Sequence, residues 1–194
     1  MGFESSRRYG RFWDDAKSLD GMINNFLFHT TGKNERDFEN CFASTLMNGR
    51  DKFKSQVITQ IDKSTTVKSV YCFGKKHRPD MTLAENGIAI ELKFINYAGL
   101  KGAIGQGYLY RLQYRFVFLV LIVSEDKKTI YEDLCDGKEK DLEDTLQHLA
   151  DNMNIFTYIV PAFYLKKPGM KKCYSYFEPI NEIFKANEDK PLIT

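Results

Sequence analysis

One stretch decides the fold that the sequence predicts, and it reads His77-Arg78-Pro79-Asp80-Met81-Thr82-Leu83-Ala84-Glu85-Asn86-Gly87-Ile88-Ala89-Ile90-Glu91-Leu92-Lys93-Phe94. Asn86-Gly87 separates two alternating runs, and this dipeptide is the strongest short-range signal of a β-hairpin. It suits a type I′ turn, because both central residues of that turn need a positive φ. We therefore predict a hairpin with a two-residue loop, in which Thr82 faces Glu91 and Asp80 faces Lys93.

The predicted pairing sorts the side chains of the hairpin onto two faces, because side chains alternate along a strand and paired residues point the same way. The apolar face should cover the core, and it carries Met81, Leu83, Ile90, Leu92 and Phe94. The polar face carries Asp80, Thr82, Glu91 and Lys93. Two carboxylates and a lysine thus converge on one surface.

Such a surface favours a divalent cation. Mg²⁺ prefers oxygen ligands, keeps several waters and shares phosphate oxygens with its substrate. A lysine beside the ion can help deprotonate a water or stabilise the charge that develops on a phosphate. For the hairpin alone, a simpler interpretation stays open. Asp80 and Lys93 would then form a salt bridge on a solvated face, because oppositely charged pairs across strands are common.

The residues Pro79-Asp80, followed on the second strand by Glu91-Leu92-Lys93, resemble the motif of the PD-(D/E)xK nuclease superfamily. The resemblance implies an α/β, restriction-endonuclease-like fold, with an αβββαβ core whose mixed central sheet is flanked by helices. It implies that Asp80, Glu91 and the backbone carbonyl of Leu92 hold one or two Mg²⁺ ions, with Mn²⁺ as a substitute. Lys93 would act on the attacking water.

A glutamate-bearing helix is predicted ahead of the hairpin. It runs from Glu35 to about Met47, with Asn34 as its N-cap and with an apolar stripe formed by Phe38, Phe42, Thr45 and Leu46. The superfamily usually places a glutamate on its first helix, where it reaches the metal site directly or through water. Glu35 and Glu39 both fit this position. We prefer Glu39 as a catalytic and metal-binding residue, and assign Glu35 to the favourable end of the helix dipole.

A basic segment leads into the hairpin. Arg50 to Arg78 contains eight basic residues and two acidic ones, and strands are predicted within it at Val57–Ile61 and Val67–Phe73, joined by a turn at Lys63–Thr66. A polyanion arriving here meets a favourable potential. We expect Lys75, Lys76 and Arg78 to contact phosphates. The alternative is an ordinary solvated lysine surface.

The segment Tyr97 to Arg115 is rich in glycine in its first half, at Gly99, Gly102, Gly105 and Gly107. Each interior glycine costs a helix about 1 kcal/mol relative to alanine. The pattern therefore predicts a loop before the helix, or the close approach of a backbone or ligand.

Gln106 and Tyr110 stand four residues apart in this segment and share a helix face. They resemble the Gln-x-x-x-Tyr helix that follows the catalytic hairpin in many members of the superfamily, notably the RecB-like exonucleases. In those enzymes both residues line the active site and touch substrate phosphate, although Asp is usual there where this chain has Glu91. The resemblance implies a catalytic role for Gln106 and nucleic-acid contacts for Gln106 and Tyr110. The alternative is two ordinary helix residues.

The remaining pattern completes the predicted core. Phe116 to Val123 is apolar without alternation, as in a central strand covered on both faces. A helix is predicted from Lys138 to Met153. Ile155–Leu165 and Cys173–Phe177 should then form a late hairpin around Pro168-Gly169, with lysines at its tip.

Length and composition predict a single domain. The 194 residues are 43% hydrophobic, and no apolar run is long enough for a membrane span. The four cysteines are scattered and no CxxC occurs, which favours reduced thiols in a cytoplasmic protein. We divide the chain into a helical N-terminal extension (1–31), a catalytic core (32–123), and a C-terminal helix and β-hairpin (124–194).

The sequence thus predicts a metal-dependent deoxyribonuclease that hydrolyses DNA phosphodiester bonds, as an endonuclease rather than an exonuclease. The expected partner is DNA, no membrane is expected, and a homodimer stays open. Two alternatives also stay open. One is a catalytically silent, nuclease-like module that binds nucleic acid or a protein partner, and the other is a phosphate-handling enzyme without a nucleic-acid substrate.

Overall fold

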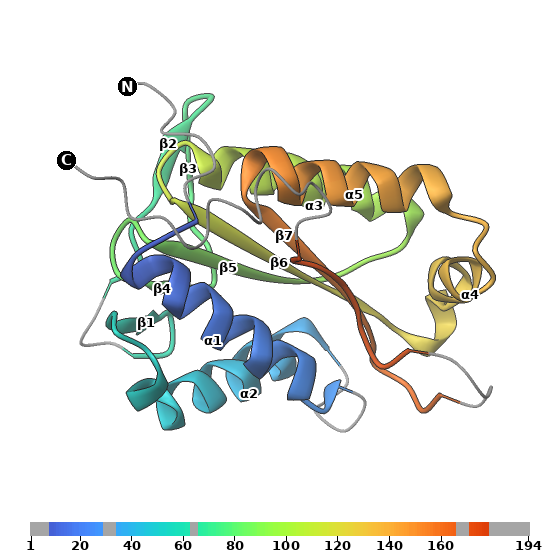
Figure 1. The fold of residues 1–194 in the computed structure, drawn as a ribbon, viewed down its shortest axis with the longest axis horizontal. Coiled ribbons are helices and arrows are strands. Elements are labelled where there is room, and N and C mark those ends of the chain that lie inside the picture. The colour runs from blue at the N-terminus through green and yellow to red at the C-terminus, as the bar shows by residue number, and fades with distance from the viewer. Residues whose placement is uncertain (1–7, 29–33, 63–65, 166–170, 179–194) are drawn as a thin grey trace.

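The computed structural model describes residues 8–28, 34–62, 66–165 and 171–178. A mixed six-stranded sheet lies between two layers of helices, so the fold is α/β (Figure 1). The sheet contains, in spatial order, β1 (Val57–Thr59), β4 (Met81–Leu83), β5 (Ile88–Phe94), β6 (Phe116–Val123), β7 (Ile155–Pro161) and β8 (Tyr174–Tyr176). The three central strands, β5, β6 and β7, are parallel, and their neighbours on both sides pair antiparallel.

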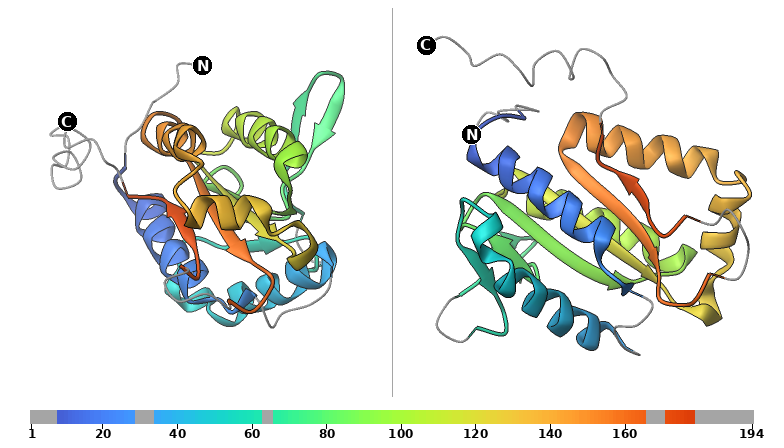
Figure 2. Two further views of the ribbon diagram at one scale, coloured as in Figure 1. Left: turned by 90° about the vertical axis from the view of Figure 1, so that its right-hand side faces the viewer. Right: turned by 60° about the horizontal axis from the view of Figure 1, so that its bottom comes forward.

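The helices divide between the two faces of the sheet. One face is covered by α1 (Arg11–Asn25) and α2 (Glu35–Asn48), and the other by α3 (Tyr97–Arg111), α4 (Thr129–Cys135) and α5 (Lys140–Met153) (Figures 1 and 2). Short 3-10 turns, η2 and η3, occupy Arg50–Lys52 and Glu125–Lys127. The sequence predicted α2 and α5 closely and predicted a helical extension where α1 lies, but it missed α4.

Strand β6 forms the centre of the core, and all of its residues are buried, as predicted. Its even-numbered side chains join one hydrophobic cluster with α1 and α2, and its odd-numbered side chains join the other with α3, α4 and α5. Aromatic rings fill the first cluster, where Trp13 of α1 stacks on Phe177 at a centroid distance of 5.1 Å. Removing an aromatic side chain from such a core costs about 3–5 kcal/mol.

The predicted hairpin exists as β4 and β5, but its register differs from the prediction. Met81 pairs with Ile90, Thr82 with Ala89 and Leu83 with Ile88, so the connection is four residues long and the two-residue turn at Asn86-Gly87 was wrong. The positive φ falls on Ala84, at 59°. The register moved by two residues and the side-chain period is two, so the predicted division into two faces is retained.

Packing, and not the predicted two-residue turn, requires a glycine at position 87. A Cβ at this position would lie 2.5 Å from the carbonyl oxygen of Leu83 and 2.7 Å from the ring of Phe12. Only glycine fits between the start of β5 and α1. This contact fixes where the connection ends, and nothing in the local sequence announces it.

The glycine-rich segment is helical from Tyr97 onward, so the predicted loop before the helix was wrong. Asn96 caps the helix, because its side-chain oxygen accepts a hydrogen bond from the N–H of Gly99 at 2.9 Å. Gly107 gives the close backbone approach that was the alternative. A Cβ there would lie 3.0 Å from Leu119 on β6 and 3.2 Å from Ile155 on β7.

The strand predicted at Val67–Phe73 is shorter and does not join the sheet. It forms β2 (Val70–Cys72), which pairs antiparallel with β3 (Lys75–His77) in a separate hairpin. This hairpin projects from the body beside the C-terminal end of α3 (Figures 1 and 2). Most of the turn predicted at Lys63–Thr66 lies outside the described residues.

The late hairpin is confirmed by the antiparallel pairing of β7 and β8, although both strands are shorter than predicted. Its predicted turn at Pro168-Gly169 lies outside the described residues. His148 on α5 is exposed.

Candidate active site

Asp80 stands just before β4 and is held there by β1. The side-chain N–H of Gln60 donates to the carbonyl of Pro79 at 3.0 Å, and the backbone N–H of Gln60 donates to the carbonyl of Asp80 at 3.3 Å. The side-chain oxygen of Gln60, Oε1, also accepts a hydrogen bond from the Arg78 guanidinium at 3.2 Å. Gln60 thus positions the whole Arg78–Asp80 segment. No local sequence pattern signals this role, because the contact depends on tertiary packing.

Beyond the end of β4, carboxylate side chains accept the backbone hydrogen bonds that a neighbouring strand would otherwise accept from β5. The last β4 residue in the ladder, Met81, lies opposite Ile90, so β5 runs on beyond its partner. There the N–H of Leu92 donates to Asp80 Oδ2 at 2.8 Å, and the N–H of Phe94 donates to Glu35 Oε2 at 2.8 Å. The N–H and C=O of a strand residue point to the same side. The carbonyl of Leu92 therefore faces the same edge as Asp80.

Glu91 lies at the centre of a directed chain of hydrogen bonds. Lys93 Nζ donates to Gln106 Oε1 at 3.3 Å, Gln106 Nε2 donates to the Tyr110 hydroxyl at 2.6 Å, and that hydroxyl donates to Glu91 Oε2 at 3.0 Å. Lys93 Nζ also lies 3.9 Å from Glu91 Oε1. The chain therefore closes on Glu91 and fixes the orientation of its carboxylate.

The alternative of a salt bridge between Asp80 and Lys93 is not what the structure contains. Lys93 pairs with Glu91, because the true register brings Glu91 level with Asp80. The Lys93 side chain is 38% exposed and the Glu91 side chain 7%. The Lys93 ammonium thus lies between solvent and the buried Glu91 carboxylate. A ligand that enters from solvent would contact the ammonium before the carboxylate.

Both central carboxyl groups are hard to ionise. Burial and the neighbouring Glu91 raise the pKa of Asp80 to about 8, although the N–H of Leu92 opposes this. Burial raises the pKa of Glu91 to about 7, against the lowering effects of Tyr110 and Lys93. Burial and Glu91 also raise the pKa of the Tyr110 hydroxyl far above its usual value, so it stays a donor. Two desolvated acids of this kind are stabilised in their charged form by a cation.

Both helix glutamates face this cluster, since both act on the pKa values of Asp80 and Glu91. Glu35 anchors α2 to the end of β5 through its bond to Phe94, which goes beyond the helix-dipole role we had assigned to it. Burial and then Glu35 raise the pKa of Glu39, while Arg36 and Lys93 lower it. Both carboxylates lie near the cluster, and Glu39 stays our prediction for the helix acid.

Tyr110 does not lie where the expected contact with nucleic acid could form. Its side chain is fully buried and its hydroxyl is engaged with Gln106 and Glu91, so it orients Glu91 from within the core. Gln106 is partly exposed beside Lys93. Thr82, which was assigned to the same face, is buried, and its hydroxyl makes no hydrogen bond within the structure.

The predicted phosphate-contacting residues lie on and just after the β2–β3 hairpin. Lys75 and Lys76 are exposed on β3, and Arg78 follows the strand, where it is exposed and donates to Gln60. Only Arg78 and Pro79 separate the end of β3 at His77 from Asp80. The basic hairpin and the acidic cluster are therefore consecutive in the chain.

The fit of this cluster to a metal ion follows from its donors. Within the described ranges, no group of three or more His, Cys, Asp or Glu side chains is arranged to hold a metal ion. Two carboxylates and one backbone carbonyl nevertheless suit Mg²⁺, which keeps several waters and binds through one or two carboxylates plus substrate phosphates. Asp80, Glu91 and the Leu92 carbonyl provide this donor set.

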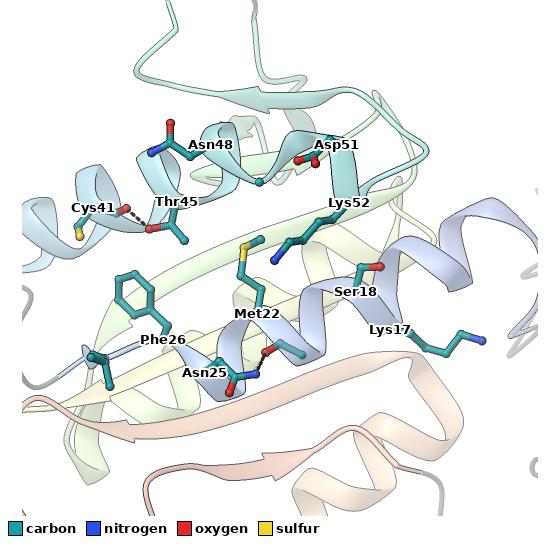
Figure 3. Close-up of a pocket in the computed structure, with 13 residues that line it drawn as sticks. Lys17, Ser18, Met22, Asn25, Phe26, Cys41, Thr45, Asn48, Asp51 and Lys52 are labelled. Atoms are coloured by element: carbon teal, nitrogen blue, oxygen red, sulfur yellow. Dashed lines mark hydrogen bonds between the residues drawn. The ribbon is translucent and has the colours of Figure 1, made fainter.

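A wider groove lies elsewhere, between α1 and α2, with a volume of about 1090 Å³ (Figure 3). Its lining includes Met22, Phe26, Cys41, Thr45 and Lys52. Nothing in this lining resembles the carboxylate pair of the β5 edge. We therefore place the candidate active site at the acidic cluster.

In comparisons with protein-family models, with curated proteins and with solved structures, nothing matches this chain. Among the residues that the structure describes, no helix is long and apolar enough to cross a membrane.

Proposed function

We propose that this chain is a Mg²⁺-dependent deoxyribonuclease of the PD-(D/E)xK type, with a restriction-endonuclease-like fold. One observation carries the proposal: two desolvated carboxylates, Asp80 and Glu91, lie at a free edge of β5 together with Lys93. A cation favours the charged form of such a pair, and phosphodiester hydrolysis uses cations in this way.

The order of the elements supports the fold. Helix α2 is followed by the antiparallel strands β1, β4 and β5, then by α3 and by β6, which is parallel to β5. This is the αβββαβ order that the motif implies, with the β2–β3 hairpin inserted between β1 and β4. The acidic residues occupy the same places in that order as the motif requires.

Asp80, Glu91 and the carbonyl of Leu92 would hold the ion, with Glu39 nearby. When bound, Mg²⁺ or Mn²⁺ supplies Lewis-acid polarisation of the phosphate and lowers the pKa of water. The protein itself supplies orientation. Asp80 is fixed by the N–H of Leu92, and Glu91 is fixed by the Tyr110 hydroxyl.

Lys93 is the residue that meets the substrate. Its ammonium is partly exposed and is held by Gln106 at 3.3 Å, so its position is set before any ligand arrives. We assign to it the orientation of the attacking water and the stabilisation of charge that develops on the phosphate oxygens. Lysine suits this role as a compact charge on a flexible stem.

The test is a cleavage assay on a panel of single-stranded, duplex, branched and closed circular DNA and of RNA, with Mg²⁺ and with chelator. The parent should cut DNA only with the ion, and cutting of the closed circle identifies an endonuclease. Asp80→Ala should abolish cleavage while the protein stays folded by circular dichroism. The matched control is Asp144→Asn, which removes an exposed carboxylate from α5.

Full activity of folded Asp80→Ala would refute the proposal. DNA binding without cleavage on every substrate would favour a silent module. Cleavage of RNA alone would retain the site but change the substrate.

A further inference from the structure

The β2–β3 hairpin ends in an unusual residue for a tight turn. Cys72 pairs with Lys75, so the loop consists of Phe73 and Gly74 alone. Their φ values are 51° and 72°, and two positive values at these positions are what a type I′ turn requires. Phe73 is 85% exposed, so its ring stands in solvent at the tip.

The stability of the fold gives no reason for a phenylalanine here. Type I′ turns favour Asn, Asp or Gly, and a bulky residue at positive φ is an outlier that costs free energy. Burial of the Phe73 ring cannot offset this cost, because most of the side chain is in solvent. Backbone strain of this kind points to a functional role. An exposed, strained aromatic residue is therefore suited to contact something outside the chain.

The base of the hairpin is fixed, so the tip is presented on a firm arm. Val70 is buried among side chains of α3 and its neighbours, and the hydroxyl of Tyr114 donates to the carbonyl of Lys68 at 2.7 Å. On the opposite face of the hairpin, Tyr71 is 71% exposed and pairs with Lys76. The outer surface thus combines aromatic rings with positive charge.

The charge of the hairpin identifies the kind of partner. Residues 66–79 contain four basic residues and no acidic one. Exposed aromatic rings among cations are how proteins bind DNA whose bases are unpaired, because every base can stack on a ring while lysines follow the phosphates. Asp80 follows this segment directly. Asp80 is the sixth residue after Gly74, so roughly extended chain places the two at most about 20 Å apart, or about six base steps.

We propose that Phe73 stacks on an unpaired base, and that the DNA bound by this protein contains single-stranded nucleotides about six base steps from the acidic cluster. The proposal rests on the proposed function for the cut itself, and on the hairpin alone for the binding. It makes the substrate a single strand, a junction or a frayed end, and not an intact duplex.

The test compares Phe73→Asn with the parent in chelator, where no cleavage occurs. Asparagine is favoured in this turn, so the midpoint of urea unfolding should equal or exceed that of the parent. The affinity for a labelled single-stranded oligonucleotide should fall by about 5- to 150-fold, the range for loss of one stacked base. The affinity for a blunt duplex of the same sequence should stay within about twofold.

Two variants serve as controls. Phe73→Tyr keeps a ring and should keep the single-strand affinity. Tyr164→Asn removes an exposed ring three residues after β7 and should leave DNA binding unchanged. The carboxyl end of β7 lies on the side of the molecule away from the β2–β3 hairpin (Figures 1 and 2).

Unchanged single-strand affinity in folded Phe73→Asn would overturn the proposal, and so would an equal loss on the duplex. A loss of binding to phosphatidylserine vesicles with DNA binding intact would also overturn it, because the tip would then be a membrane contact. The two proposals fail separately. Cleavage by the parent with no effect of Phe73→Asn on binding refutes only the stacking, whereas ring-dependent binding without cleavage refutes only the nuclease.

Discussion

Replacing Asp80 by asparagine separates a metal-binding acid from an ordinary surface carboxylate. The amide keeps the size of the side chain, and its oxygen can still accept the hydrogen bond from the N–H of Leu92. What the substitution removes is a carboxyl group whose pKa is raised to about 8 by burial and by Glu91. The expected effect is therefore on how stability depends on pH and on Mg²⁺.

The sign follows from which state holds the proton. Without metal, folded Asp80 keeps its proton up to about pH 8, whereas the unfolded chain releases it near the ordinary value of 3.8. The folded state thus binds more protons in this window, and its stability is highest at low pH and is lost as the pH rises. One proton contributes about 1.4 kcal/mol per pH unit. Between about pH 5 and pH 7, the parent should lose about 3 kcal/mol more than Asp80→Asn.

The assay is urea unfolding at pH 5 and pH 7, in chelator and in Mg²⁺. In chelator, the free energy of unfolding of the parent should fall by about 3 kcal/mol more than that of Asp80→Asn between pH 5 and pH 7. A ligand at 100 times its dissociation constant stabilises the folded state by about 2.7 kcal/mol. Saturating Mg²⁺ should therefore stabilise the parent at pH 7 by this order and leave Asp80→Asn unchanged.

Asp144→Asn is the control, because it removes a single carboxylate from the exposed surface of α5. It should follow the parent at both pH values and in both buffers. Parallel loss of stability in the parent and Asp80→Asn between pH 5 and pH 7 would refute the assignment. An equal gain from Mg²⁺ in both proteins would place the ion elsewhere.

Three further outcomes test the remaining parts of the site. Lys93→Ala should lower single-turnover cleavage by about 100-fold or more while costing about 1 kcal/mol or less in stability, and Lys93→Arg should recover little of the rate; a parent-like rate would leave Lys93 a simple ion-pair partner. Glu39→Gln should lower cleavage by about 10- to 100-fold at unchanged unfolding midpoint, and full activity would exclude the helix acid from the reaction. Neutralising Lys75, Lys76 and Arg78 together should reduce the slope of log affinity for single-stranded DNA against log salt by about 2, and an unchanged slope would show a solvated surface only.

The sequence predicted best what depends on local periodicity. Alternation placed Asp80, Glu91 and Lys93 on one face, and that division holds although the register was wrong by two residues. The apolar run of β6 likewise predicted a strand buried on both faces, which it is. Such features depend on neighbours a few residues away, so a single sequence contains them.

Features set by distant contacts could not be predicted. The turn between β4 and β5 is determined by the packing of Gly87 against Phe12 on α1, and Asn86-Gly87 gave a misleading local signal. A two-residue loop with two positive φ values is found instead at Phe73-Gly74. Phenylalanine is disfavoured in that turn, so turn statistics pointed away from it. This conflict between local preference and observed structure is typical of functional positions.

The geometry of the β5 edge gives a physical reason for a proline before the aspartate. Continuing the register of β4 by two residues would place Pro79 opposite Leu92, in a pair that normally exchanges two hydrogen bonds. Proline has no N–H, so it cannot donate to the Leu92 carbonyl, and its own carbonyl is bonded to Gln60. The N–H of Leu92 turns to Asp80 instead. The proline thus ends the ladder at the position where the proposed function requires the Asp80 carboxylate and the Leu92 carbonyl to face a cation.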